Sequence, residues 1–125
     1  MSPINSRAKG AVGEREICQV VKELFGWQAE RTQQHCGNAG DSDVRIAELP
    51  AAFVEVKRVQ KLNVTQAMEK ATEQCQGKLP LLMHRRNHGP WLLTINLSQL
   101  QELVKMVSAC TQTEQSDPPS PSGVT

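Results

Sequence analysis

Aromatic side chains are scarce in this chain of 125 residues, which has two Phe, two Trp and no Tyr. Proteins that hold single-stranded nucleic acid by stacking use several aromatic faces for successive bases. The composition therefore argues against an aromatic-lined binder of RNA or of single strands.

The sequence also lacks long apolar runs and paired cysteines. No segment approaches the roughly 20 apolar residues of a membrane span, and the first residues contain no apolar stretch typical of a signal peptide. The four cysteines show no CxxC spacing, and the three histidines have no zinc-type pairing with them, so we interpret the histidines as loop residues. We expect free thiols in a reducing cytoplasmic compartment and no membrane partner.

Positive charge is missing from the C-terminal end of the chain. From Ser108 onward there is no Lys or Arg and there are two acids, so residues 1–107 carry a net charge of about +3 while the whole chain carries +1. The last residues are rich in Pro, Ser and Thr and cannot bury enough surface to offset their ordering entropy. We predict one domain over residues 7–109 and a disordered tail over residues 110–125.

Hydrophobic periodicity predicts an α/β domain with a central mixed sheet flanked by helices, in the order αβββαββα. Gly26 and Gly77 are predicted to end the first two helices, and Asn63 to cap the second one. The expected helices cover residues 11–25, residues 63–75 and a segment from Ser98 onward. The expected strands cover residues 27–33, 43–49, 51–59, 78–86 and 90–98.

The segment Gly40–Arg58 carries a pattern that simple burial does not explain. Glu55 and Lys57 are two residues apart on one predicted strand, so their side chains leave the same face of the sheet. Polar residues inside an apolar strand are typical of functional sites. By itself the pair is weak evidence, because an exposed cross-strand ion pair would give the same pattern.

Asp43 strengthens the functional interpretation. It begins the preceding strand, and antiparallel pairing would bring its carboxylate toward Glu55. Two adjacent carboxylates repel each other, and a divalent cation with oxygen ligands relieves that repulsion. The carbonyl oxygen of Val56 would add a ligand, and the Lys57 ammonium would stabilise the charge that develops on a phosphate. The pattern therefore favours phosphodiester hydrolysis.

The residues Asp43 and Glu55-Val56-Lys57 resemble the signature of the PD-(D/E)xK nuclease superfamily. The stretch "KGAVGERE", residues 9–16, is similar to the KGxxxER motif of archaeal-type Holliday junction resolvases and places Glu14 and Arg15 in it. The resemblance covers about residues 7–76, and small resolvase-like proteins of phages and prophages look most alike. Ser42 replaces the family's proline. Asp41 is a less suitable alternative to Asp43, and Ser42 or Asn38 would be the hydroxyl or amide residue of the preceding loop.

The resemblance implies a restriction-endonuclease-like core and a Mg²⁺- or Mn²⁺-dependent endonuclease of DNA recombination and repair. It implies a homodimer that acts on four-way junctions and leaves 5′-phosphate ends, in the cytoplasm of a bacterium or a phage-infected host. Its implied catalytic residues are Glu14, Asp43, Glu55 and Lys57. Its implied metal ligands are Glu14, Asp43, Glu55 and Val56.

The same comparison suggests residues that contact DNA: Lys9, Arg15, Arg58, Lys61 and Gln66. Solvated surface charges would look the same in sequence, and an acid such as Glu14 is also favoured in the first turn of a helix by the helix dipole. Glu16 is predicted to be solvated. The basic turn with Arg85, Arg86 and His88 either contacts a DNA backbone or is an ordinary turn.

Two other functions remain open at this stage. A different nuclease of the same superfamily would share the site and differ in its DNA substrate. A DNA-binding module that keeps the fold without catalysis would bind DNA and cut none. The apolar stripe of the last helix, with Leu100, Leu103, Val104 and Val107, suits either a core or a dimer interface.

Overall fold

The structure is a computed structural model that describes residues 6–32 and 42–114, with side chains described over 11–32 and 42–110. Its order of elements confirms the predicted α/β class and the αβββαββα arrangement, with one added 3-10 turn before the last helix. The elements are α1 (Ser6–Phe25), β1 (Ala29–Arg31), β2 (Val44–Ile46), β3 (Ala52–Arg58), α2 (Val64–Gln74), β4 (Leu79–Arg85), β5 (Leu92–Thr94), η1 (Leu97–Gln99) and α3 (Leu100–Glu114).

The five strands form one mixed sheet in the order β1-β2-β3-β4-β5. β3 and β4 are parallel over seven residue pairs, and the other neighbouring strands are antiparallel. A parallel pair needs a long crossover connection, and α2 provides it between β3 and β4. The mixed central sheet flanked by helices is the α/β architecture that the sequence predicts.

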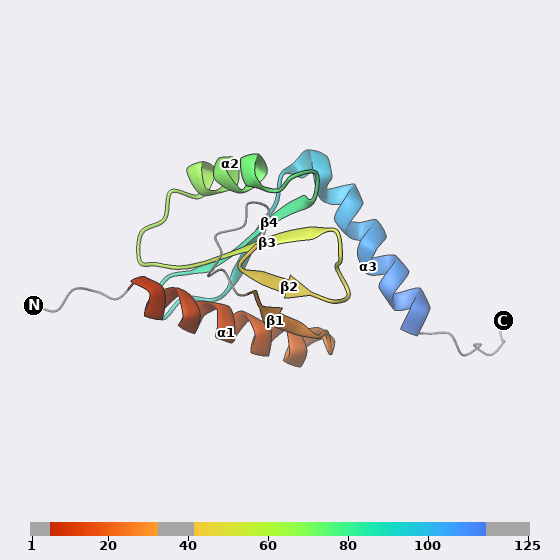
Figure 1. The fold of residues 1–125 in the computed structure, drawn as a ribbon, viewed down its shortest axis with the longest axis horizontal. Coiled ribbons are helices and arrows are strands. Elements are labelled where there is room, and N and C mark those ends of the chain that lie inside the picture. The colour runs from red at the N-terminus through yellow and green to blue at the C-terminus, as the bar shows by residue number, and fades with distance from the viewer. Residues whose placement is uncertain (1–5, 33–41, 115–125) are drawn as a thin grey trace, which may run out of the picture.

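Helices α1 and α2 lie on opposite faces of the sheet (Figure 1). The side chains of β3 alternate between these faces, because successive side chains of a strand point to opposite sides. Val54 and Val56 belong to the cluster that contains Ile17 and Val21 of α1. Phe53 packs with residues of α2, which form a second, smaller cluster with it: Ala71 and Cys75.

The alternation fixes the faces of the polar residues of β3. Glu55 and Lys57 follow Phe53 at two-residue intervals and therefore share the α2 side of the sheet. Arg58 follows Val54 and Val56 onto the α1 side, where its Cβ would lie 3.2 Å from a Cβ added at Gly13. The expectation that Glu55 and Lys57 share a face is confirmed.

The end of α1 and the start of α2 agree with the predictions, whereas the start of α1 does not. Gly26 has a φ of 73°, and its N–H donates to the Lys22 carbonyl at 2.8 Å, as expected of a residue that follows a helix. Asn63 caps α2 by accepting from the Gln66 N–H at 3.0 Å. α1 begins at Ser6 rather than at Ala11, because good helix formers extend a helix beyond its apolar stripe.

The predicted tail boundary is wrong by five residues. α3 continues to Glu114, whereas the tail was predicted to start at residue 110. Adding a residue to an existing helix gains a hydrogen bond without a new nucleus, so polar residues can continue it. The rest of the predicted tail, residues 115–125, lies outside the described residues.

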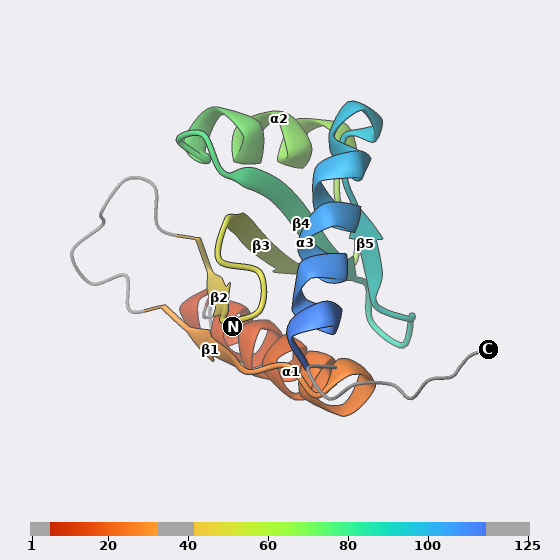
Figure 2. The ribbon, with the colours of Figure 1, turned by 90° about the vertical axis from the view of Figure 1, so that its right-hand side faces the viewer.

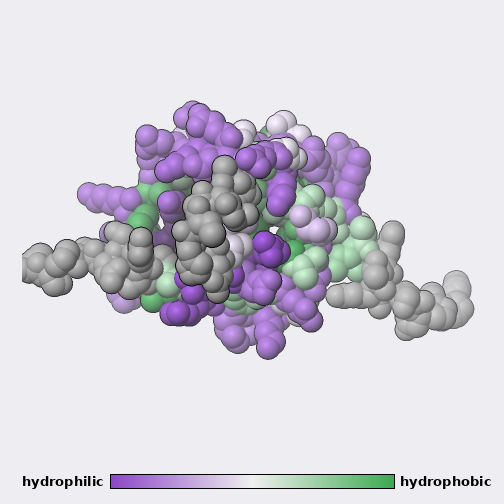
Figure 3. Space-filling model, viewed as in Figure 1, coloured by the Kyte–Doolittle hydropathy of each residue, from purple (hydrophilic) through white to green (hydrophobic). Residues whose placement is uncertain are grey.

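α3 leaves the sheet at β5 and crosses toward the α1 side of the molecule (Figure 2). Leu103, Met106 and Val107 pack partly buried against the core, while Leu100 and Val104 stay exposed. Hydrophobic residues accordingly gather over α3 in Figure 3, beside a largely hydrophilic surface. Within the part of the chain that the structure describes, no helix is long and apolar enough to cross a membrane.

Candidate active site

Asp43 lies at the bend immediately before β2, and backbone geometry directs it toward β3. Its N–H donates to the Val54 carbonyl at 3.0 Å, beside the paired residues Val44 and Val54. Its carboxylate Oδ2 accepts from the Val56 N–H at 2.9 Å. Asp43 is therefore held against β3 by both its backbone and its side chain.

Glu55 and Asp43 form a close carboxyl pair. The pKa of Glu55 is raised from 4.5 to about 8, first by burial and then by the charge of Asp43 and a side-chain hydrogen bond with it. The positive charges of Lys57 and Lys70 act in the opposite direction and are weaker. A neutral Glu55 that hydrogen-bonds to a charged Asp43 is the expected state of such a pair at neutral pH. The predicted convergence of the two acids is therefore present.

The surroundings of this pair suit a divalent cation. A cation beside the two carboxylates would relieve the repulsion that raises the Glu55 pKa. The N–H and C=O of one strand residue point to the same edge, so the Val56 carbonyl is directed to the side on which its N–H meets Asp43. Two carboxylates and a carbonyl are oxygen ligands of the kind that Mg²⁺ takes, together with water and phosphate. The donor set of Asp43, Glu55 and Val56 therefore fits Mg²⁺ or Mn²⁺.

Lys57 follows this pair on the α2 face and pairs in register with His84 of the parallel strand β4. His84 is buried, and its Nε2 lies 2.8 Å from the Thr94 hydroxyl oxygen. Burial lowers the pKa of His84, so the imidazole next to Lys57 is neutral at neutral pH. β4 extends through His84 to Arg85, so His84 lies in a strand, as the predicted strand over residues 78–86 implies, and not in a loop as the histidine interpretation has it.

Glu14 approaches the pair from α1 but is bound to Arg31 of β1. The Arg31 Nε lies 2.9 Å from Glu14 Oε1, and the Glu14 side chain is only 14% exposed. Burial, with a smaller contribution from the charge of Asp43, raises the pKa of Glu14, while Arg31 opposes the rise. Over the described side chains, no three acids, histidines or cysteines come close enough to hold a metal ion. The structure thus places Glu14 within electrostatic range of Asp43, and among the described side chains the three acids do not form one cluster.

The residues predicted to contact DNA lie in different places. Arg15 is exposed next to Glu14, and Lys61 and Gln66 are exposed at the entry to α2. The side chain of Lys9, in α1, lies outside the described part. Arg58 points to the α1 side, away from the acid pair, and its Nε is 3.4 Å from Glu16 Oε1.

Glu16 is not the solvated acid that the sequence predicts. One of its carboxylate oxygens lies 3.4 Å from the Arg58 Nε and 3.3 Å from an Arg85 terminal nitrogen, and the Arg85 guanidinium lies over the Trp91 ring. The three elements α1, β3 and β4 are thereby joined at one point. Because Arg58 and Arg85 are far apart in sequence, their common partner becomes visible only in the fold.

The loop before Asp43 also differs in part from expectation. Ser42 is buried, and its hydroxyl donates to the Val44 carbonyl at 2.7 Å, so it fixes the backbone rather than facing the acids. Thr32, which the sequence analysis missed, donates its hydroxyl to the Ser42 and Asp43 carbonyls. Asn38 and Asp41 lie outside the described residues, as do His35 and Cys36. Of the other cysteines, Cys18 and Cys75 are free thiols as expected.

Sequence reasoning missed two cationic neighbours of the acids, Arg31 and Lys70. Arg31 is the last residue of β1 and forms an ion pair with Glu14. Lys70 lies in α2, within electrostatic range of Glu55. The signal for Arg31 was the pairing of β1 with β2, which places Arg31 opposite Val44. The position of Lys70 in its helix is visible in the sequence. It indicates that Lys70 lies near Glu55 only when the direction of α2 over the sheet is also known.

Comparison with known proteins gives one solved structure. No family model and no curated protein matches the sequence. The matching structure is the 1.6 Å structure of Hjc from Archaeoglobus fulgidus, a Holliday junction resolvase from an archaeal hyperthermophile, with 19% identity and a TM-score of 0.43 over 70% of this chain and 72% of that chain. This is a protein of the kind that the sequence resembles.

Proposed function

We propose that this protein is a metal-dependent DNA endonuclease that hydrolyses phosphodiester bonds, with a four-way junction as its substrate. The observation that supports it is the Asp43–Glu55 pair. The Val56 N–H donates to the Asp43 carboxylate, and the burial of Glu55 together with the charge of Asp43 raises the pKa of Glu55 to about 8. Strained carboxyl pairs of this kind, with a lysine on the same face, are typical of functional sites.

Different residues of the site would bind the metal ion and the phosphate. Asp43, Glu55 and the Val56 carbonyl would hold a Mg²⁺ or Mn²⁺ ion, which when bound supplies Lewis-acid stabilisation of the charge on the phosphate. Lys57 lies on the same face as Glu55, where its ammonium orients the phosphate and stabilises the negative charge of the transition state. The neutral His84 beside it leaves the Lys57 charge available to the phosphate.

Glu14 and Arg31 serve a second purpose at this site. Their ion pair fixes an arginine near Asp43, at 39% exposure of its side chain, where a DNA strand can reach it. Arginine binds phosphate in a bidentate manner, so Arg31 is suited to hold a backbone phosphate next to the cleaved one. Glu14 would then position Arg31 and complete the negative field of the metal site.

A homodimer completes the proposal, because two nicks across a junction require two sites related by two-fold symmetry. The support for it is a run of exposed apolar side chains from η1 into α3, with Leu97 82% exposed. Leu100 and Val104 lie one helical turn apart on the same face of α3, and Leu97 precedes them in η1. Exposed apolar residues grouped in this way are typical of interaction surfaces.

The proposed dimer is tested by light scattering. A Leu97→Asp, Val104→Asp double variant is expected to be a folded monomer, whereas the wild type has twice the mass of one chain. Val12→Asp is the matched control, since Val12 is 41% exposed in the first half of α1, which lies across the molecule from α3 (Figure 1). A monomeric wild type at all concentrations would remove the dimer from the proposal.

The function is tested with a labelled four-way junction and a linear duplex of the same arm sequence, each with Mg²⁺ or with EDTA. We expect symmetric nicks in the junction with Mg²⁺ alone, and a loss of at least about 100-fold in Lys57→Ala, the size typical of a removed charge-stabilising group. Equal cutting of both substrates would indicate a nuclease without junction preference. Tight binding with no cutting in Mg²⁺ or Mn²⁺ would refute the catalytic proposal and indicate a binding module.

A further inference from the structure

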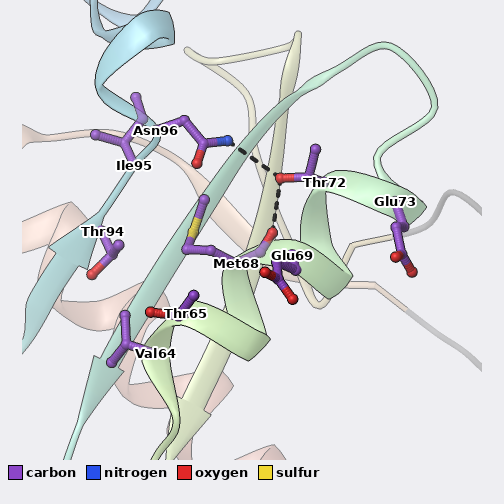
Figure 4. Close-up of a pocket in the computed structure, with 9 residues that line it drawn as sticks. All are labelled: Val64, Thr65, Met68, Glu69, Thr72, Glu73, Thr94, Ile95 and Asn96. Carbon is purple, nitrogen blue, oxygen red and sulfur yellow. Dashed lines mark hydrogen bonds between the residues drawn. The ribbon is translucent and has the colours of Figure 1, made fainter.

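The helix α2 has two long edges of different character. One edge borders an open groove of about 620 Å³ against the segment that follows β5 (Figure 4). The groove is lined on the α2 side by Val64, Thr65, Met68, Glu69, Thr72 and Glu73, and on the other side by Thr94, Ile95 and Asn96. Asn96 closes part of it by donating to the Thr72 hydroxyl at 3.3 Å. The carboxylates of Glu69 and Glu73 make this edge unfavourable for phosphate.

The buried stripe of α2 fixes the direction of the opposite edge. Met68, Ala71 and Cys75 are buried against the sheet, and Ala71 and Cys75 contact Phe53 of β3. A helix turns by 100° per residue, so Glu69 and Lys70 leave α2 on opposite sides of this stripe. Since Glu69 borders the groove on the β5 side, Lys70 leaves toward β3.

The order of the chain places Lys70 beside the acids and not at a distant point of β3. α2 connects the end of β3 to the start of the parallel strand β4, so it runs antiparallel to β3. Later residues of α2 therefore lie over earlier residues of β3. Ala71 and Cys75 reach Phe53, and Lys70 lies toward Glu55, the next residue of that face. The electrostatic influence of the Lys70 ammonium on Glu55 agrees with this position.

We propose that Lys70 binds a backbone phosphate of the DNA strand in the active site, so that the strand passes along the lysine edge of α2 and not through its acidic groove. This inference rests on the proposed function and adds a substrate-binding residue to it. Lys70 is exposed, belongs to no ion pair among the described residues, and is the one cation that α2 carries. A lysine ammonium in this setting acts as a point charge for phosphate.

The test measures binding without metal and cleavage with metal in the same variants. Binding of a fluorescent four-way junction in EDTA is followed by anisotropy between about 50 and 200 mM NaCl, where each phosphate contact contributes about one unit to the salt slope. We expect Lys70→Ala to bind about tenfold more weakly at low salt and to lose about one unit of slope. Lys70→Arg should keep most of the affinity, because the charge remains.

Lys22→Ala is the matched control, since Lys22 is an exposed helix lysine two turns beyond Glu14 on α1. It should change neither affinity nor slope by more than the error. With Mg²⁺, Lys70→Ala should raise KM for the junction about tenfold with little change in kcat, because the contact is made before the chemical step. Melting curves of the two alanine variants establish that both are folded.

The outcomes separate this inference from the proposed function. If the wild type cuts DNA and Lys70→Ala binds and cuts like Lys22→Ala, the role of Lys70 is refuted and the nuclease remains. If the wild type binds and never cuts, while Lys70→Ala still loses affinity and slope, the nuclease is refuted and the phosphate contact remains. A wild type that binds no DNA overturns both.

Discussion

Replacing Glu55 by Gln tests whether the carboxyl pair is strained in the metal-free protein. The amide has the shape of the protonated carboxyl group and can donate to Asp43, but it does not titrate. In the wild type, Glu55 keeps its proton up to a pKa of about 8 when folded and loses it near 4.5 when unfolded. The unfolded state therefore binds fewer protons between these values, and stability falls as pH rises through this window.

The size of the effect follows from the same two values. A difference of one pKa unit corresponds to about 1.4 kcal/mol, so the full loss above pH 8 amounts to at most about 5 kcal/mol. A small domain has a total stability of roughly 5–15 kcal/mol, so a loss of this size is easily measured. Glu55→Gln should match the wild type near pH 4.5 and be more stable by a growing margin up to pH 8.

Urea unfolding in EDTA at a series of pH values between 4.5 and 9 measures this margin. The difference between the two proteins cancels the contributions of Glu14 and His84, whose pKa values are also shifted. In a parallel series with Mg²⁺, the wild type should gain stability at high pH, because ligand binding to the folded state stabilises it, while Glu55→Gln should respond less.

A constant difference between the two proteins across this pH range would refute the reasoning. It would mean that Glu55 titrates alike in both states, and that the carboxyl pair is neither buried nor close enough to share a proton. A variant that is less stable than the wild type at every pH would refute it as well, since the uncharged side chain should suit the metal-free site.

Three further substitutions test other parts of the structure. Glu16→Gln should destabilise the fold by about 1–2 kcal/mol in urea, because Arg58 and Arg85 lose their shared carboxylate; no change would mean that the ion pairs are absent in solution. Gly13→Val should cost about 1–3 kcal/mol, since even a Cβ at this site lies 3.2 Å from the Arg58 Cβ, and an unchanged melting temperature would contradict this packing. Burial lowers the pKa of His84, so stability should fall as pH drops below 6.5, and melting of His84→Gln between pH 7 and 5 should lack that part of the fall.

Much of the fold could be predicted from local sequence signals. The caps at Gly26 and Asn63 come from residue types that suit helix ends, and both occur as predicted. The shared face of Glu55 and Lys57 comes from the period of a strand, which no tertiary contact alters. The strands β1, β2 and β5 are shorter than predicted, because a strand lasts only as long as its neighbour pairs with it.

The predictions fail mainly where the surroundings of a residue are set by a partner that is distant in the sequence. Glu16 looks like any helix acid, and only the packing of α1 on β3 and β4 brings two arginines to it. His84 lies in a predicted strand, but only the pairing of β4 with β5 brings its imidazole to the Thr94 hydroxyl.

The sequence by itself determined the order of the elements, the helix caps, and the shared face of Glu55 and Lys57, because each depends on residue type and local period. The tertiary structure decided which charges meet. The bend before β2 puts the Asp43 carboxylate on the Val56 N–H, the pairing of β1 with β2 brings Arg31 to Glu14, and the direction of α2 turns Lys70 toward Glu55. Electrostatic interactions depend on distance in space, and only the packing of strands and helices brings groups far apart in the chain within that distance.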